Sequence, residues 1–161
     1  MAALCQWLLL TIFVGAALGK IESYDTFLRT LTAIPWLPLR AARIAARGVP
    51  LIELAVAVAL LAAPRAGAIA ALATLAVFTG VVGVELAAGR RFACGCFGGA
   101  AVRPADGTYL ARNALLVAAA AGLVVRPGDR PVGAALVGVG AGLALLLVEL
   151  TVETFRAREA S

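Results

Sequence analysis

Apolar residues dominate five stretches of the chain, which short charged or proline-containing segments separate. The stretches are residues 4–19, 49–63, 66–88, 109–125 and 132–151. A helix that crosses a bilayer needs roughly 20 apolar residues, so residues 66–88 are long enough without help, whereas 49–63 needs an extra turn or a thinned region. We predict an all-α polytopic membrane bundle of four to five transmembrane helices. Residues 1–152 are expected to form one integral membrane domain, and residues 153–161 a polar tail.

Residues 27–47 depart from this pattern because apolar and basic positions alternate there. The basic positions are Arg29, Arg40, Arg43 and Arg47. The pattern predicts one or two amphipathic helices at the membrane interface, broken at Pro35 and Pro38, with Trp36 at headgroup level. A helix packed on the rim of the bundle is the alternative.

Composition narrows the function classes. Of the 161 residues, 63% are hydrophobic and 14% charged, against about 25% charged in soluble domains, which excludes an ordinary water-soluble globule. The absence of histidine excludes Ser-His-Asp and Cys-His catalysis and histidine zinc sites. The net charge of +5 in so apolar a chain indicates loops that face anionic lipid, so no nucleic-acid partner is expected.

The strongest local motif is Cys94-Gly95-Cys96-Phe97-Gly98, just after the third apolar stretch. Extended residues i and i+2 lie about 7 Å apart, so a disulfide between the two cysteines needs the bend that glycine permits. Strained, exposed disulfides exchange readily, and nearby arginines such as Arg112 favour the attacking thiolate. The motif therefore predicts thiol-disulfide exchange at Cys94 and Cys96.

Two alternatives remain for this pair. The cysteines could be ordinary loop residues that only staple a non-catalytic assembly scaffold. They could also bind a soft metal such as Cu(I), although two sulfurs without histidine make an incomplete site. Cys5, near the start of the first stretch, is expected to be inert apolar filler that does not pair with the loop cysteines.

Alternation of the spans brings several ionisable residues to one membrane face. They are Lys20, Glu53, Glu85, Arg112 and Glu149, together with the cysteine loop. Because charges in spans are costly, they usually pair with one another or line a site. We expect Glu53 and Glu85 to partner Lys20 and Arg112 beneath the loop, and Glu149 to reach the headgroups. The glycines at 80, 83, 138, 140 and 142 are expected to pack helices closely.

These residues carry a resemblance. Residues 15–20, Pro50 with Glu53, the Cys94–Gly98 motif and Arg112-Asn113 together resemble the methylamine utilisation protein MauE family, small DoxX-like polytopic membrane proteins. The likeness covers residues 4–125, and the cysteine motif is its most specific part.

The resemblance implies a protein of the cytoplasmic membrane that supports processing, transport or maturation of a disulfide-containing partner. That partner would be the methylamine dehydrogenase small subunit or another exported protein, with a thioredoxin-like redox partner beside it. No cofactor motif is evident. A quinone suits a membrane thiol oxidoreductase in principle, but the chain lacks the CxxC of vitamin K epoxide reductases, so direct quinone reduction is unsupported.

Two arguments disagree on orientation. Counting Lys and Arg by the positive-inside rule places the cysteine loop in the cytoplasm. The role that the resemblance implies requires the exoplasmic face, where disulfides persist. We follow the charge count and expect the cysteine loop to face the cytoplasm.

Overall fold

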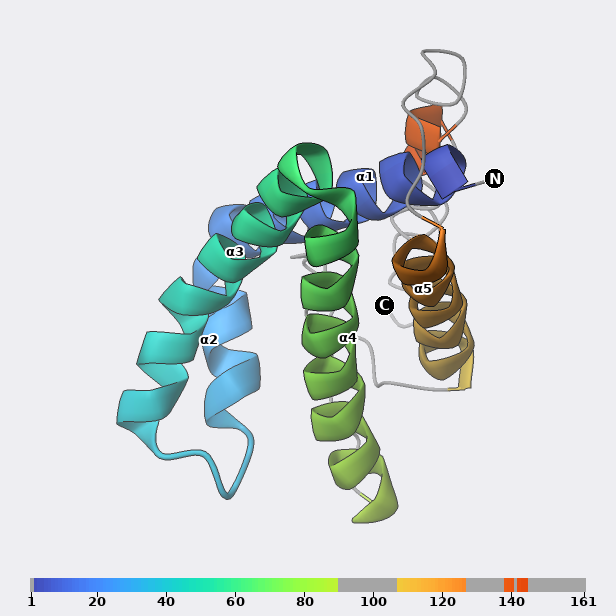
Figure 1. Ribbon diagram of the computed structural model, residues 1–161. Helices are drawn as coiled ribbons and strands as arrows, with labels where there is room; N and C mark the ends of the chain where they lie inside the picture. Colours follow the sequence, from blue (N-terminus) through green and yellow to red (C-terminus); the bar gives the residue numbers. More distant parts are fainter. Residues whose placement is uncertain (1, 90–106, 127–137, 141, 145–161) are drawn as a thin grey trace.

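The computed structural model describes residues 2–89, 107–126, 138–140 and 142–144, and these contain five α-helices (Figure 1). In chain order they are α1 (Ala2–Glu22), α2 (Tyr24–Thr32), α3 (Leu39–Ala62), α4 (Pro64–Ala87) and α5 (Gly107–Val125). By length and composition, α1, α3 and α4 are able to cross a membrane, and the apolar part of α5, Leu110–Val125, is shorter. The predicted all-α polytopic membrane bundle is confirmed.

The core lies where four helices meet. Its buried residues come from α1, α3, α4 and α5, and include Leu9, Phe13, Leu60, Leu75 and Leu123. Figure 1 shows α4 and α5 side by side, and both α3 and α5 pack against α1. Many large apolar side chains point outward instead, such as Ile44, Val58 and Val77, as expected of helices whose outer faces contact lipid.

The turn between α3 and α4 consists of Ala63 alone. Pro64 begins α4, where its missing N–H and fixed φ are tolerated. Gly67, one turn later, packs directly on the end of α3: a Cβ there would lie 2.6 Å from the carbonyl carbon of Ala59 and nearer still to the Leu60 backbone. Only glycine allows this close approach, which sets the two helices against each other.

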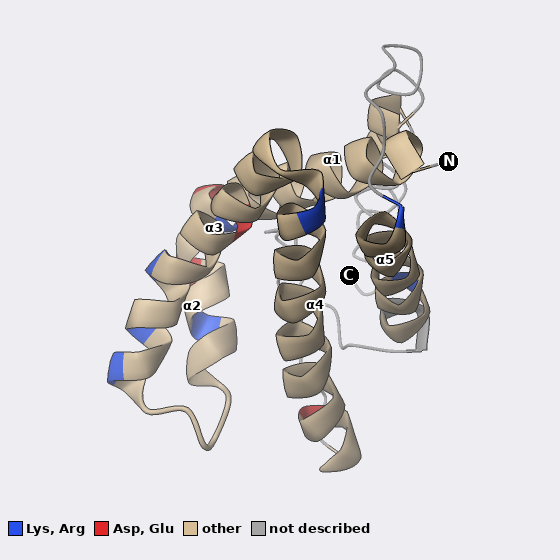
Figure 2. Cartoon of the chain, in the orientation of Figure 1, with Lys and Arg blue, Asp and Glu red and all other residues tan. Residues whose placement is uncertain are grey.

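The second span begins earlier than the sequence predicted. The prediction placed it at residues 49–63, but α3 starts at Leu39 and continues through Pro50. The residues before Pro50 are mostly Ala, Arg, Leu and Ile, which are strong or moderate helix formers, and a proline is tolerated inside a membrane helix. The arginines at 40, 43 and 47 therefore lie on the first half of a long helix, and all three are exposed (Figure 2).

The predicted proline break is present. The helix α2 ends at Thr32, and Pro38 precedes α3 with extended backbone angles of φ −66° and ψ 146°. Between them, Ile34 is buried with Val82 of α4 in a second, smaller apolar cluster that Leu31 and Leu37 extend. The hairpin of α2 and α3 is thus held against the end of α4.

The prediction that glycines let helices pack closely is confirmed at two of the five positions. A Cβ at Gly138 would lie 2.5 Å from Trp7 Cβ, and a Cβ at Gly142 would lie 2.6 Å from Thr11 Cβ, so the described part of the fifth stretch packs closely on α1. By contrast, a Cβ at Gly80, Gly83 or Gly140 would meet nothing within 4 Å in the described part of the chain. No close contact is described at these three glycines, so their part in helix packing stays a prediction.

Candidate functional site: a buried ion pair beside a mostly apolar cavity

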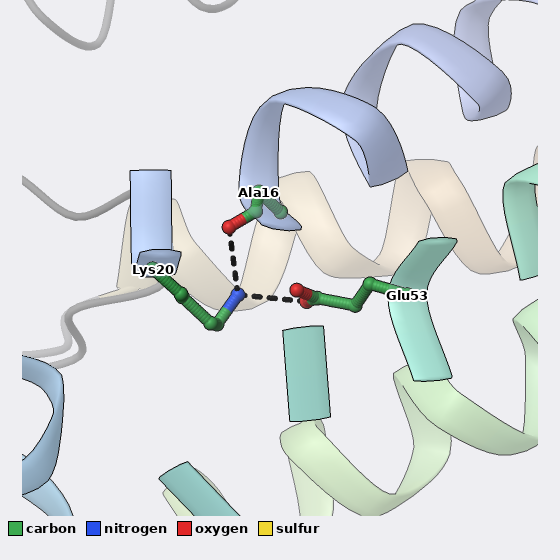
Figure 3. A network of polar contacts seen from close by, with 3 residues as sticks. All are labelled: Ala16, Lys20 and Glu53. Carbon is green, nitrogen blue, oxygen red and sulfur yellow. Dashed lines mark hydrogen bonds and ion pairs between the residues drawn. The ribbon is translucent and has the colours of Figure 1, made fainter. Parts of the chain in front are cut away.

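A buried ion pair joins α1 to α3. Lys20 Nζ lies 2.7 Å from Glu53 Oε1 and 3.4 Å from the carbonyl oxygen of Ala16 (Figure 3). Each of the two charged residues is only 2% exposed. The pairing matches the expectation that alternation of the spans brings these charges together.

Aromatic rings flank the ammonium group. Lys20 Nζ lies 5.6 Å from the ring centroid of Phe27 in α2 and 5.7 Å from that of Phe78 in α4. At such distances the negative faces of the rings attract a cation. Together with Glu53, they give Lys20 favourable contacts from three other helices, which offset part of the cost of burying its charge.

A partly open cavity of about 30 Å³ adjoins the ion pair. Its polar wall comes from Lys20, Glu53, Arg112 and Asn113. The apolar wall is formed by Ile12, Phe13, Ala16, Leu75, Phe78 and Leu116. The lining therefore combines two cations, one carboxylate and one amide with aliphatic and aromatic surface, and it draws residues from α1, α3, α4 and α5.

Asn113 links the two helices that flank the cysteine loop. Its Nδ2 donates to Thr79 Oγ1 at 2.9 Å, and the residue is 3% exposed. This contact connects α5 to α4, and the sequence did not predict it, because an amide beside Arg112 indicates polarity but not a partner. The placement of Phe27 and Phe78 around Lys20 was likewise not predicted.

Glu85 has a described partner that the sequence did not predict. Its side chain is 1% exposed, and its Oε1 accepts a hydrogen bond of 2.9 Å from Trp36 Nε1. Trp36 itself is 53% exposed, so the bond runs from the surface of the turn between α2 and α3 to a buried carboxylate near the end of α4.

The motif Cys94-Gly95-Cys96-Phe97-Gly98 lies outside the described residues, as does Glu149. Cys5 is a free cysteine, half-buried against the main core. Among the residues that the structure describes, no group of three or more His, Cys, Asp or Glu side chains gathers as a metal site would require. The predictions for the cysteine loop, including the metal alternative, stay predictions.

Comparison with known proteins identifies the family to which the chain belongs. The family model described as "Methylamine utilisation protein MauE" matches residues 1–126. A "Methylamine utilization protein MauE" of Paracoccus denitrificans is 36% identical over 112 residues, a match that covers 68% of this chain and 60% of that relative. No solved structure matches. The resemblance is thereby confirmed over most of the chain, which belongs to the methylamine utilisation protein MauE family.

Proposed function

We propose that this protein acts in methylamine utilisation, in the cytoplasmic membrane, by supporting maturation of a disulfide-containing partner through thiol-disulfide exchange at Cys94 and Cys96. The observation that carries the proposal is the position of the charged site. Arg112 lies five residues into α5 and Phe78 lies nine residues before the end of α4, so the cavity is within about 8–14 Å of helical rise from the two ends that hold the cysteine loop.

The exchange would run in two steps. A thiolate of the partner attacks one sulfur of the Cys94–Cys96 disulfide, which forms a mixed disulfide and releases the other loop cysteine as a thiolate. A second partner thiolate then attacks the mixed disulfide, so the partner gains its disulfide and the loop is left as a dithiol. A thioredoxin-like protein carrying a disulfide would reoxidise the loop by the reverse exchange and take up the two electrons.

Arg112, Glu53 and Gly95 have distinct roles in this proposal. Arg112 would lower the energy of a nearby thiolate, which is the form that attacks or leaves. Glu53 would hold Lys20 in place at the junction of four helices, and Gly95 would permit the bend that a disulfide between alternate residues needs. The substrate we infer is the methylamine dehydrogenase small subunit or a similar exported protein. This proposal requires the cysteine loop to lie at the exoplasmic face, opposite to the side that the charge count predicts.

The redox state of the pair tests the chemistry. Membranes are equilibrated in graded redox buffers, and thiols are counted with a mass-tagging maleimide in the Cys5→Ser background. We expect the pair to convert between dithiol and disulfide at mild potentials. A pair that stays reduced throughout contradicts exchange, and a pair that never reduces favours the scaffold.

The cysteine variants test the role in the cell. Cys94→Ser and Cys96→Ser should each abolish maturation of the partner without lowering the abundance of the membrane protein, and Cys5→Ser, the matched control, should leave maturation intact. Loss of the protein itself in both loop variants would indicate a structural role. Copper that copurifies in proportion to these two thiols would favour the metal carrier.

A further inference from the structure

Three exposed arginines lie on one side of the first half of α3. Arg40, Arg43 and Arg47 follow the spacing i, i+3, i+7, which places them within an arc of about 60° on a helix of 3.6 residues per turn (Figure 2). None of the three has an acidic partner among the described residues. The acidic residue of the hairpin, Asp25, lies in the first turn of α2, at the far end from the turn that leads into α3. This side of α3 therefore carries uncompensated positive charge and favours an anionic partner.

The same side of α3 continues as apolar surface. Leu51, Ala55 and Val58 lie within about 60° of Arg40 around the helix axis, and all three are exposed. The exposed fraction is 65% for Leu51 and 63% for Val58. One outward stripe of the helix is thus basic in its first half and apolar in its second. A phospholipid has the same order of groups, because its charged phosphate is followed by acyl chains.

The length of α3 places the arginines at the depth of phosphates. By helical rise, Arg47 lies about 24 Å and Arg40 about 35 Å from Ala63, where α3 turns into α4. The hydrocarbon core of a bilayer is about 30 Å thick, so with Ala63 at one border the three arginines span the opposite border and reach the headgroup layer. Long arginine side chains extend to that layer from within a span. An acidic protein in the aqueous phase matches the charge but not the apolar half of the stripe, so a lipid fits better.

We propose that this stripe of α3 is a binding site for an anionic phospholipid. Its phosphate contacts Arg40, Arg43 and Arg47, since guanidinium groups bind phosphate oxygens with charge-assisted hydrogen bonds. Its acyl chains lie along Leu51 and the apolar residues that follow. A zwitterionic lipid is disfavoured because its choline cation adds positive charge beside three arginines. The site does not involve the cysteine pair, so it stands or falls separately from the proposed function.

A tryptophan placed on the stripe measures which lipid lies next to it. Leu51→Trp is made in the Trp7→Phe/Trp36→Phe background, which removes both natural tryptophans. The full-length chain is reconstituted in equimolar phosphatidylglycerol and phosphatidylcholine, with bromine on the upper acyl chains of one lipid or the other. Bromine quenches tryptophan only at short range, so the two quenching values give the relative occupancy. We expect phosphatidylglycerol to be favoured about three- to tenfold beside this reporter.

Charge variants assign the preference to the arginines. The triple change Arg40→Gln/Arg43→Gln/Arg47→Gln should bring the ratio close to one, whereas lysine at the same three positions should keep most of it. The matched control is Arg65→Gln, an exposed arginine at the start of α4, which should leave the ratio unchanged.

A second reporter controls for general effects on the bilayer. Val77→Trp lies on α4, is 63% exposed in the native residue, and is about 21 Å from Ala63 by helical rise, against about 18 Å for Leu51. The triple glutamine change should leave the ratio at this reporter unaltered. An equal fall at both reporters would mean that the arginines act on the whole bilayer and form no site, which overturns the proposal.

Lipid retention tests the site without any reporter. The protein with its natural tryptophans is extracted from equimolar vesicles into mild detergent, and the retained lipids are counted by mass spectrometry. We expect an excess of phosphatidylglycerol that the triple glutamine variant loses. The proposal is overturned if the wild type retains both lipids equally, which would favour an acidic protein as the partner of the arginines, or if the triple variant keeps the excess.

Discussion

Lys20 and Glu53, which lie 33 residues apart in the chain, form an ion pair of 2.7 Å inside the helix bundle. The pair joins the last turn of α1 to the middle of α3, and the ring contacts of Lys20 extend the junction to α2 and α4. Four of the five described helices are therefore linked through one ammonium group.

Breaking this pair from one side should be costly. Lys20→Met leaves the Glu53 carboxylate buried without its partner, and we expect a loss of about 3–5 kcal/mol in the free energy of unfolding. The double variant Lys20→Met/Glu53→Leu should lose less than the sum of the two single variants, since no uncompensated charge remains. SDS titration in mixed micelles measures the free energy of unfolding of the two single variants and the double variant. Arg43→Met, at an exposed position of α3, should stay within about 0.5 kcal/mol of the wild type. Additive losses in the double variant would show that the two charges do not depend on each other.

The hydrogen bond from Trp36 to Glu85 should be measurable by a double-mutant cycle. Trp36→Phe keeps an aromatic ring but removes the donor, and because Trp36 is half exposed we expect a loss of about 1 kcal/mol. In the Glu85→Gln background the same change should cost less, because the charged acceptor is already gone. Trp7→Phe is the control: Trp7 Nε1 has no hydrogen-bond partner among the described residues, so this variant should show no coupling to Glu85→Gln. Equal costs of Trp36→Phe in both backgrounds would argue against the contact.

Gly67 and Gly80 lie on the same helix and should respond oppositely to alanine. At Gly67 the added Cβ meets the backbone of α3, which cannot yield as a flexible side chain would, so Gly67→Ala should destabilise the fold by about 1–3 kcal/mol. At Gly80 the Cβ meets nothing within 4 Å in the described chain, so Gly80→Ala should be neutral or stabilise by up to about 1 kcal/mol through helix propensity. SDS unfolding of the two variants side by side tests the close approach of α3 and α4. Equal effects would refute it.

A similar pair of glycines tests the contact between α1 and the fifth apolar stretch. Gly142→Ala should destabilise the protein because its Cβ would lie 2.6 Å from Thr11 Cβ. Gly140→Ala, whose Cβ would meet nothing within 4 Å among the described residues, should not. Limited proteolysis in detergent should detect the difference as faster cleavage after residue 126 in Gly142→Ala. Protection equal to that of the wild type would mean that this packing contributes little.

The sequence by itself determined the fold class, because apolar runs of near-bilayer length leave helices as the structures that satisfy their own backbone hydrogen bonds in lipid. It also indicated that Lys20 and Glu53 share a membrane face, since alternation of spans follows from their number and order alone. The start of α3 was not predictable in this way: Pro50 signals a helix start as readily as an interior position, and only packing on α1 and α4 decides between them.

The tertiary structure alone decided which buried charge meets which neighbour. Hydrophobic patterns locate Lys20, Glu53, Glu85 and Arg112 along their helices but carry no information on helix rotation or crossing. The rotation and crossing of the helices depend on close contacts between them, such as Gly67 against Leu60. Once the helices are set in this way, residues from distant parts of the chain come together. Phe27 and Phe78 around Lys20, Asn113 on Thr79 and Trp36 on Glu85 all follow from that packing.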